Sequence, residues 1–296
     1  MTDKLPTFSQ AQGLEPLPQP LNLNELSKKF RARLWTTIFE SMCGSKIDFT
    51  GQRSNRGIYI GYHWKRVLLD VYLEFFDVPP DEFSDRFSSN QYIVKTFIYE
   101  ASYNQIFDFL QGAMRHDYCP PQLPQQIAKV LNDGLTAYTL VEDPWTIIPR
   151  ATPEEGAAVE RALTALKGAG LSGARSHLLK AGENLSGGNF NDSVRESVHA
   201  VESVARTLAP KGSTTLKPAL DALVKGGTTI HPALYHAMVK MYGYTSDEKG
   251  IRHSYLSEAT KVGLPEALFM FGACASFATY LLGKARESGI DITTSK

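Results

Sequence analysis

The sequence contains little cysteine, no excess of charge of either sign and no uncharged stretch of the ~20 residues that a spanning helix requires. Its 296 residues include only three cysteines, Cys43, Cys119 and Cys274, with no CxxC pair. This argues against zinc or redox pairs and favours a reducing compartment. Lys and Arg total 31, as do Asp and Glu, so the formal net charge is zero. The balance excludes broad electrostatic attraction to nucleic acid or anionic membrane, although a neutral protein can still carry a local basic site.

The longest uncharged stretch of the chain is Ala267 to Gly283, and its length decides whether it could span a membrane. It is shorter than the ~20 residues that a spanning helix requires. Glu266 and Lys284 flank it closely, so we predict a buried helix of a soluble protein with no membrane partner. The first ten residues, MTDKLPTFSQ, lack the apolar run of a secretory signal, and we expect a cytoplasmic protein.

Familiar catalytic motifs are also missing. The sequence has no phosphate-binding glycine loop, no GxSxG, no HExxH and no Asp/Glu cluster with metal-ligand spacing. Common nucleotide-binding folds and metalloenzymes are therefore disfavoured, and we predict neither a metal nor a cofactor.

The pattern of hydrophobic residues, which make up 43% of the chain, predicts a mainly α-helical protein of two domains. Thr152-Pro153-Glu154-Glu155 reads as a helix start, and we place the boundary there, giving domains 1–151 and 152–296. In the first domain the apolar spacing predicts helices over 23–42, 64–76, 90–114 and 124–134, a loop over 46–61, and a short β-hairpin of strands 138–141 and 145–148.

The second domain reads as helical throughout. Predicted helices cover 152–167, 172–184, a segment capped by Asn191 or Asp192 and ending near Leu208, 215–225, 232–242 and 265–287. Short turns join most of them, so we expect a bundle of four to five helices.

Polar residues gather between the last two long helices of this bundle, in the sequence YGYTSDEKGIRH that ends at His253. The Arg252 guanidinium stays charged and donates two hydrogen bonds in a fork that suits a phosphate. The neighbouring His253 can move a proton near neutral pH. This pair is our candidate catalytic site for phosphodiester chemistry without a metal.

A structural role for the same residues stays open. Arg252 can simply pair with Asp247 or Glu248 in a loop that holds two helices together, while His253 packs locally. Supporting residues for a catalytic site would be Asp247 and Glu248 themselves, Tyr255 beside the pair, and Arg195, Glu196 and His199 on the capped helix.

The segments NFNDSVRESVHAVESVARTL, HPALYHAMVKMYGYTSDEKGIRHSYL and FMFGACASFATYLL resemble the C-terminal domain of AbiJ-type abortive-infection proteins, a branch of the HEPN superfamily. The segment LEPLPQPLNLNELSKKFRARLWTTIFE resembles the AbiJ N-terminal domain. The resemblance covers nearly the whole chain and is most specific in GYTSDEKGIRH. It implies a HEPN-like bundle of four or five helices that dimerises, preceded by a sensor or regulatory domain, in an antiviral or toxin system.

Many HEPN proteins are metal-independent endoribonucleases that use an Arg-polar-x(3–4)-His motif at a dimer cleft. Arg252 matches the motif arginine, but His253 occupies the polar position beside it. Leu256, Ser257 and Glu258 stand where the distal histidine is expected. The resemblance therefore implies either that His253 has taken over proton transfer, or that this branch has kept only assembly or RNA binding.

Three functional hypotheses follow. The first is an abortive-infection endoribonuclease, acting as a homodimer on RNA and controlled by a phage trigger or an antitoxin. The second is a non-catalytic HEPN dimer that binds a nucleic acid, a nucleotide or a protein. The third is a substrate of a nucleotidyltransferase, modified on Tyr242, Tyr244 or Tyr255.

Overall fold

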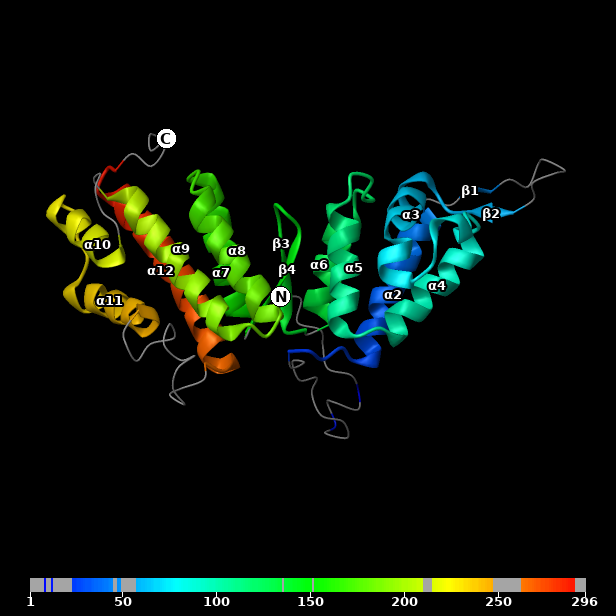
Figure 1. Ribbon diagram of the computed structural model, residues 1–296, viewed down its shortest axis with the longest axis horizontal. Coiled ribbons are helices and arrows are strands. Elements are labelled where there is room, and N and C mark those ends of the chain that lie inside the picture. The colour runs from blue at the N-terminus through cyan, green and yellow to red at the C-terminus, as the bar shows by residue number, and fades with distance from the viewer. Residues whose placement is uncertain are drawn as a thin grey trace. The chain divides into compact units, whose positions relative to one another are not determined.

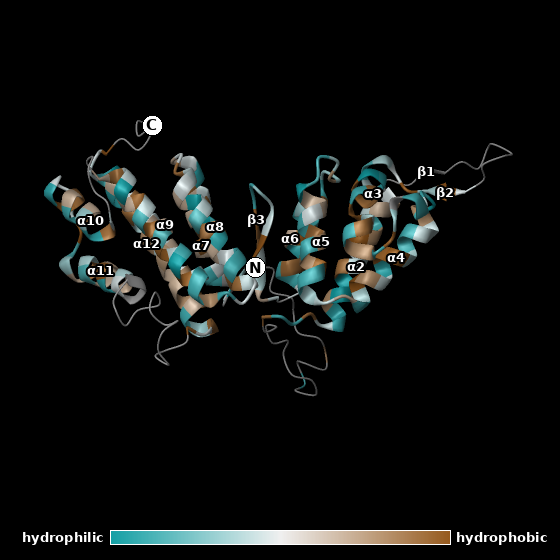
Figure 2. Cartoon of the chain, viewed as in Figure 1, coloured by the Kyte–Doolittle hydropathy of each residue, from teal (hydrophilic) through white to brown (hydrophobic). Residues whose placement is uncertain are grey.

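The computed structural model describes residues 8, 12, 23–44, 47–48, 57–134, 136–150, 152–209, 215–246 and 262–290. This part of the chain is mainly helical, as predicted (Figure 1). Several of its helices carry hydrophobic and hydrophilic residues on different faces (Figure 2). The chain divides into two compact units, Met1–Trp145 and Thr146–Lys296. The division falls a few residues before Thr152, in the connection between the strands β3 (Tyr138–Val141) and β4 (Thr146–Pro149), which form a two-stranded sheet close to the predicted positions.

The N-terminal unit is built from helices with short strands beside them. Its helices are α2 (Lys28–Gly44), α3 (Tyr62–Phe76), α4 (Phe87–Glu100), α5 (Tyr103–Arg115) and α6 (Leu123–Asp133), with a 3-10 turn at Pro80–Glu82. Helix α2 packs against α4 and α6, and α3 packs against α5. The predicted loop 46–61 was wrong in part, because it contains the antiparallel strands β1 (Ile47–Asp48) and β2 (Ile58–Tyr59).

Two further differences in this unit come from capping residues. The helix predicted from residue 23 begins at Lys28, where Ser27 Oγ accepts a hydrogen bond from the Phe30 amide at 3.0 Å. The single helix predicted over 90–114 is two helices. They are separated by Ser102, whose backbone amide binds the Gln105 side chain in a capping box that starts α5. In both places a local hydrogen bond overrides a continuous apolar pattern.

A buried tyrosine makes the stability of the N-terminal unit sensitive to alkaline pH. The Tyr72 hydroxyl donates to Asn90 Oδ1 at 2.7 Å, and burial raises the pKa of Tyr72 to about 12. The folded state keeps this proton while the unfolded chain loses it near pH 10, so stability falls as the pH rises between those values.

We therefore expect Tyr72→Phe to flatten this alkaline loss. At neutral pH it should lower the free energy of unfolding by about 1–3 kcal/mol, because Asn90 Oδ1 loses its buried donor. Urea unfolding at several pH values tests both effects. Tyr99→Phe, at an exposed tyrosine, is the control. An alkaline loss unchanged by Tyr72→Phe would contradict the assignment.

The C-terminal unit places one helix at the centre of the others. After β4 come α7 (Pro153–Gly168), α8 (Ser172–Ser186), α9 (Phe190–Leu208), α10 (Leu216–Lys225), α11 (Pro232–Ser246) and α12 (Leu264–Glu287). Helix α9 packs against α8, α10, α11 and α12, while α7 packs against α8 and α12 (Figure 1). Side chains on α9 therefore lie close to most of the unit.

Helix starts in this unit were predicted with mixed success. Thr152 does cap α7, since its hydroxyl accepts the Glu155 amide at 3.2 Å. The predicted cap of α9 was wrong, because the helix begins at Phe190, ahead of Asn191 and Asp192. Helix α11 continues to Ser246 and so includes residues predicted as loop.

Helix α12 contains the uncharged stretch Ala267 to Gly283, which is predicted above to be a buried helix and not a membrane span. Among the described residues it alone is long and apolar enough to cross a membrane, with a mean hydropathy of 1.3 over a window that is 44% buried. Length and composition are weak support for a span, because the core helix of a soluble protein has the same properties. The buried face of α12 includes Phe271, Cys274 and Leu281, and the helix packs against α7 and α9, which is consistent with a soluble protein.

A glycine in α8 permits close packing between three elements of this unit. A Cβ on Gly182 would lie 2.8 Å from Ile148 Cγ2 on β4 and 3.3 Å from Phe271 Cζ on α12. We expect Gly182→Ala to destabilise the unit by about 1–3 kcal/mol through overpacking, despite the better helix propensity of alanine.

The matched control is Gly173→Ala on the same helix, where a Cβ would meet only Ser203 Oγ at an ordinary 3.5 Å. Thermal unfolding of both variants gives the comparison. A Gly182→Ala protein as stable as Gly173→Ala would show that β4 and α12 move apart at little cost.

Candidate functional site

The predicted site residues fall into two groups. Arg252 and His253, with the supporting residues Asp247, Glu248 and Tyr255, lie outside the described residues. The other supporting residues, Arg195, Glu196 and His199, all lie on the central helix α9. The described part of the candidate site therefore consists of the polar face of α9 and the side chains of neighbouring helices that contact this face.

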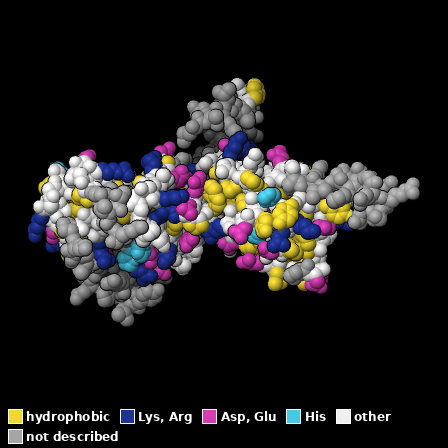
Figure 3. Space-filling view, turned by 90° about the horizontal axis from the view of Figure 1, so that it is seen from above, with side chains coloured by type: hydrophobic (Ala, Val, Ile, Leu, Met, Phe, Trp, Pro, Cys, Tyr) yellow, Lys and Arg dark blue, Asp and Glu magenta, His cyan; other side chains and the backbone are white. Residues whose placement is uncertain are grey.

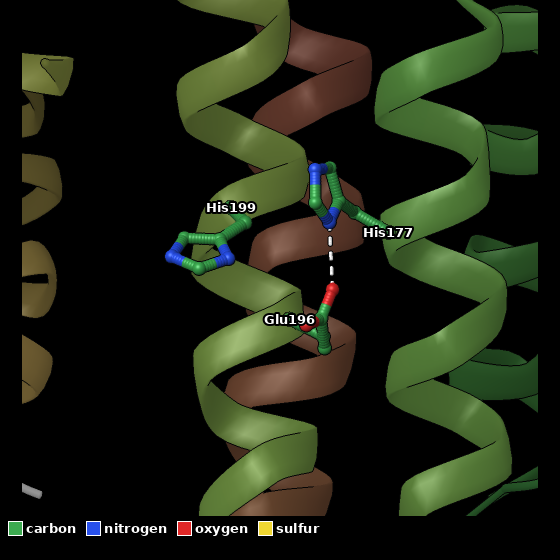
Figure 4. A group of neighbouring side chains, drawn as sticks. All are labelled: His177, Glu196 and His199. Carbon is green, nitrogen blue, oxygen red and sulfur yellow. Dashed lines mark hydrogen bonds and ion pairs between the residues drawn. The ribbon is translucent and has the colours of Figure 1, made fainter.

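A histidine of the neighbouring helix lies opposite that face. His177 on α8 places its Nδ1 2.6 Å from Glu196 Oε2, and its ring centroid is 5.4 Å from that of His199. Glu196 and His199 are three residues apart on α9, which puts them on the same side of the helix, one turn from each other. Figure 4 shows the carboxylate reaching the imidazole of the adjacent helix, with the second imidazole nearby on α9.

We call these three residues the His-Glu-His cluster. Its side chains are partly open to solvent, since His177 is 36% exposed and Glu196 is 17% exposed. In the space-filling view, histidine side chains gather on the surface of the C-terminal unit, with Lys, Arg, Asp and Glu intermixed around them (Figure 3). The cluster is therefore partly accessible to solvent, and among the described residues of the viewed face Lys and Arg are mixed with Asp and Glu and form no broad basic surface.

Burial and the neighbouring charges shift the pKa of His199 in opposing directions. Burial lowers the pKa of His199 below its ordinary value, an effect that Glu196 opposes and His177 reinforces. Arg195, next to Glu196 in sequence, forms an ion pair with Asp192 at 2.7 Å, so its charge is partly compensated. The surroundings of His199 therefore favour its neutral imidazole, whose free nitrogen can accept a proton or a metal ion.

Two imidazoles and one carboxylate also make a possible metal-ligand set. One ligand atom from each of the three residues lies within 4.8 Å of the other two. The set has no metal-ligand spacing along the chain because His177 comes from another helix, α8. The one signal available was the i, i+3 spacing of Glu196 and His199, a spacing that helical-bundle metal sites use.

Helix α9 also contacts both helices that adjoin the Arg252–His253 segment in sequence. Residues 247–263 connect α11 to α12, and both of these helices pack against α9. A small cavity marks where they meet, lined by residues of α9, α11 and α12: Val198, Val201, Met238, Met241, Tyr242, Cys274 and Phe277, together with Leu216 of α10. The C-terminal part of α11 therefore lies beside the middle of α9. One of the cavity residues there, Val198, directly precedes His199.

Comparisons of the chain with models of known protein families, with curated proteins and with solved structures gave no match. A function for the chain must therefore be inferred from its own residues. The relevant observations are the helical C-terminal unit, the polar face of α9 and the position in sequence of Arg252 and His253.

Proposed function

We propose that this chain is an abortive-infection effector, a cytoplasmic homodimer that cleaves RNA without a metal. Arg252 and His253 are the catalytic residues in this proposal, and the C-terminal unit is a HEPN-like bundle. The N-terminal unit, which resembles the AbiJ N-terminal domain, would sense a phage trigger or restrain the toxin.

The chemistry requires one cation and one proton acceptor. His253 takes the proton of a ribose 2′-hydroxyl, O2′ bonds to the adjacent phosphorus, and the bond from phosphorus to O5′ breaks as O5′ takes a proton from water. Arg252 neutralises the extra negative charge on the phosphate in the transition state. The products are a 2′,3′-cyclic phosphate and a 5′-hydroxyl.

The observation that most favours this proposal is the packing of α9 against both α11 and α12. The segment carrying Arg252 and His253 begins and ends at helices held by the same helix that carries Arg195, Glu196 and His199. Such an arrangement could place a second arginine and further polar groups near a phosphate bound by Arg252. The zero net charge is compatible with a small local cleft, which dimer symmetry would double.

A non-catalytic role is the alternative. Leu256, Ser257 and Glu258 replace the distal histidine of the HEPN motif, and the nearby polar groups of α9 have partners of their own: Glu196 binds His177, and Arg195 pairs with Asp192. In that case the dimer would bind a nucleic acid, a nucleotide signal or a protein without cleaving RNA.

Growth and RNA integrity in cells distinguish the two functions. Induced wild-type protein, with its trigger where one is needed, should arrest growth and fragment cellular RNA, whereas Arg252→Ala and His253→Ala should do neither at equal protein levels. Growth arrest with intact RNA, abolished by Arg252→Ala, would favour the binding module. Intact RNA in every culture, including triggered wild type, would refute the endoribonuclease.

A further inference from the structure

We propose that His177, Glu196 and His199 form a binding site for a divalent transition metal of the zinc type, which links α8 to α9. The metal site does not depend on catalysis by Arg252 and His253, although Glu196 and His199 are also the supporting residues proposed for that chemistry.

The donors are already close enough for small side-chain movements to complete the site. Zinc binds imidazole nitrogen and carboxylate oxygen at ~2.0–2.2 Å, so the ligand atoms of a tetrahedral site lie roughly 3.4 Å apart. In the His-Glu-His cluster, Nδ1 of His177 is 2.6 Å from Glu196 Oε2, and the three donor atoms lie within 4.8 Å of each other. Binding therefore needs shifts of roughly 1 Å in side chains that are only partly buried.

The donor set selects the kind of cation. Calcium and magnesium prefer oxygen ligands alone, whereas two imidazoles with one carboxylate suit zinc and its first-row neighbours. Three protein ligands leave a fourth position for water, which the partial exposure of the cluster allows.

The electrostatic surroundings do not oppose a cation. Glu196 supplies one negative charge, and Glu202, on the same helix, acts on His199 with a second. The positive charge of Arg195 acts on His199 in the opposite direction, and its ion pair with Asp192 partly compensates it. Arg206 pairs loosely with Glu202 at 3.8 Å, so Glu196, Glu202, Asp192, Arg195 and Arg206 together carry a net charge of −1 before a metal binds.

A bound metal would hold α8 and α9 together. These two helices pack against each other, and the hydrogen bond between His177 and Glu196 already joins them. A ligand that binds only the folded protein raises its stability, so the metal should raise the melting temperature of the C-terminal unit.

The test uses the full-length, tag-free protein after removal of metals with chelator and dialysis. Zinc titration by calorimetry and cobalt(II) titration by visible absorption measure the stoichiometry, the affinity and the coordination. We expect one ion per chain and an intense d–d spectrum typical of four-coordinate cobalt. His177→Ala and His199→Ala should each weaken zinc binding at least about 100-fold, since even residues behind the metal ligands contribute 10- to 100-fold.

Two further variants separate ligation from folding. Glu196→Gln keeps the shape of the side chain but loses its charge, and it should also weaken binding while leaving the helical circular dichroism unchanged. His236→Ala removes an exposed histidine of α11 outside the cluster and should bind zinc as wild type does.

No binding to wild type, or equal binding by wild type, His177→Ala and His199→Ala, would overturn the proposal. A cobalt spectrum of six-coordinate type would contradict the zinc-type, four-coordinate geometry, because it would show more than one non-protein ligand on the metal. None of these measurements uses RNA, so the metal site and the endoribonuclease can fail independently.

Discussion

Replacing Arg252 with alanine is expected to slow RNA cleavage about 100- to 1,000-fold, because loss of one preorganised donor to a developing oxyanion costs this much in other enzymes. Arg252→Lys should have an intermediate rate. Lysine keeps the positive charge but lacks the planar fork that binds two phosphate oxygens. Single-turnover cleavage of a labelled RNA gives the rates.

The matched control is Arg206→Ala, which removes an arginine of α9 whose ion pair with Glu202 is loose, at 3.8 Å. This variant should cleave RNA like the wild type. An Arg252→Ala rate within twofold of wild type would contradict the catalytic role of Arg252.

Leu178→Ala is expected to lower the free energy of unfolding of the C-terminal unit by about 2–5 kcal/mol, the usual cost of removing a large aliphatic side chain from a packed core. Leu178 is completely buried on α8, next to His177 in sequence. The loss of packing should loosen α8 and thereby the contact between His177 and Glu196.

Urea unfolding followed by circular dichroism measures this effect, with Lys180→Ala on the exposed side of α8 as the control. The control should lie within about 0.5 kcal/mol of wild type. If the two units unfold separately, Leu178→Ala and Tyr72→Phe should move different transitions. A cost below about 1 kcal/mol for Leu178→Ala would show that the core of the unit can collapse around the space, contrary to the usual cost.

The sequence predicted most helices because their apolar residues recur with the helical period. Two of its errors, at the start of α2 and between α4 and α5, lie where a local hydrogen bond decides the end of a helix. Ser102 interrupts an apolar pattern that is otherwise continuous, and the signal for this break, Ser102 followed three residues later by Gln105, was present in the sequence. The start of α9 was harder to predict, because Asn189 occupies its cap position without a side-chain hydrogen bond.

The candidate site could be predicted only in part, for a different reason. Glu196 and His199 share a helix, so their spacing alone brings them together. His177 joins them through the register between α8 and α9, which depends on how two buried faces fit together. No spacing along the chain encodes that register, and His177 was therefore missed.

The most direct test of the endoribonuclease is the chemistry of its product ends. Purified wild-type protein, activated by its trigger where one is needed, is incubated with RNA in excess EDTA, and the fragments are analysed by mass spectrometry. The proposal predicts fragments with 2′,3′-cyclic phosphate and 5′-hydroxyl ends that are absent with Arg252→Ala. Intact RNA, or fragments with 5′-phosphate ends, would contradict it.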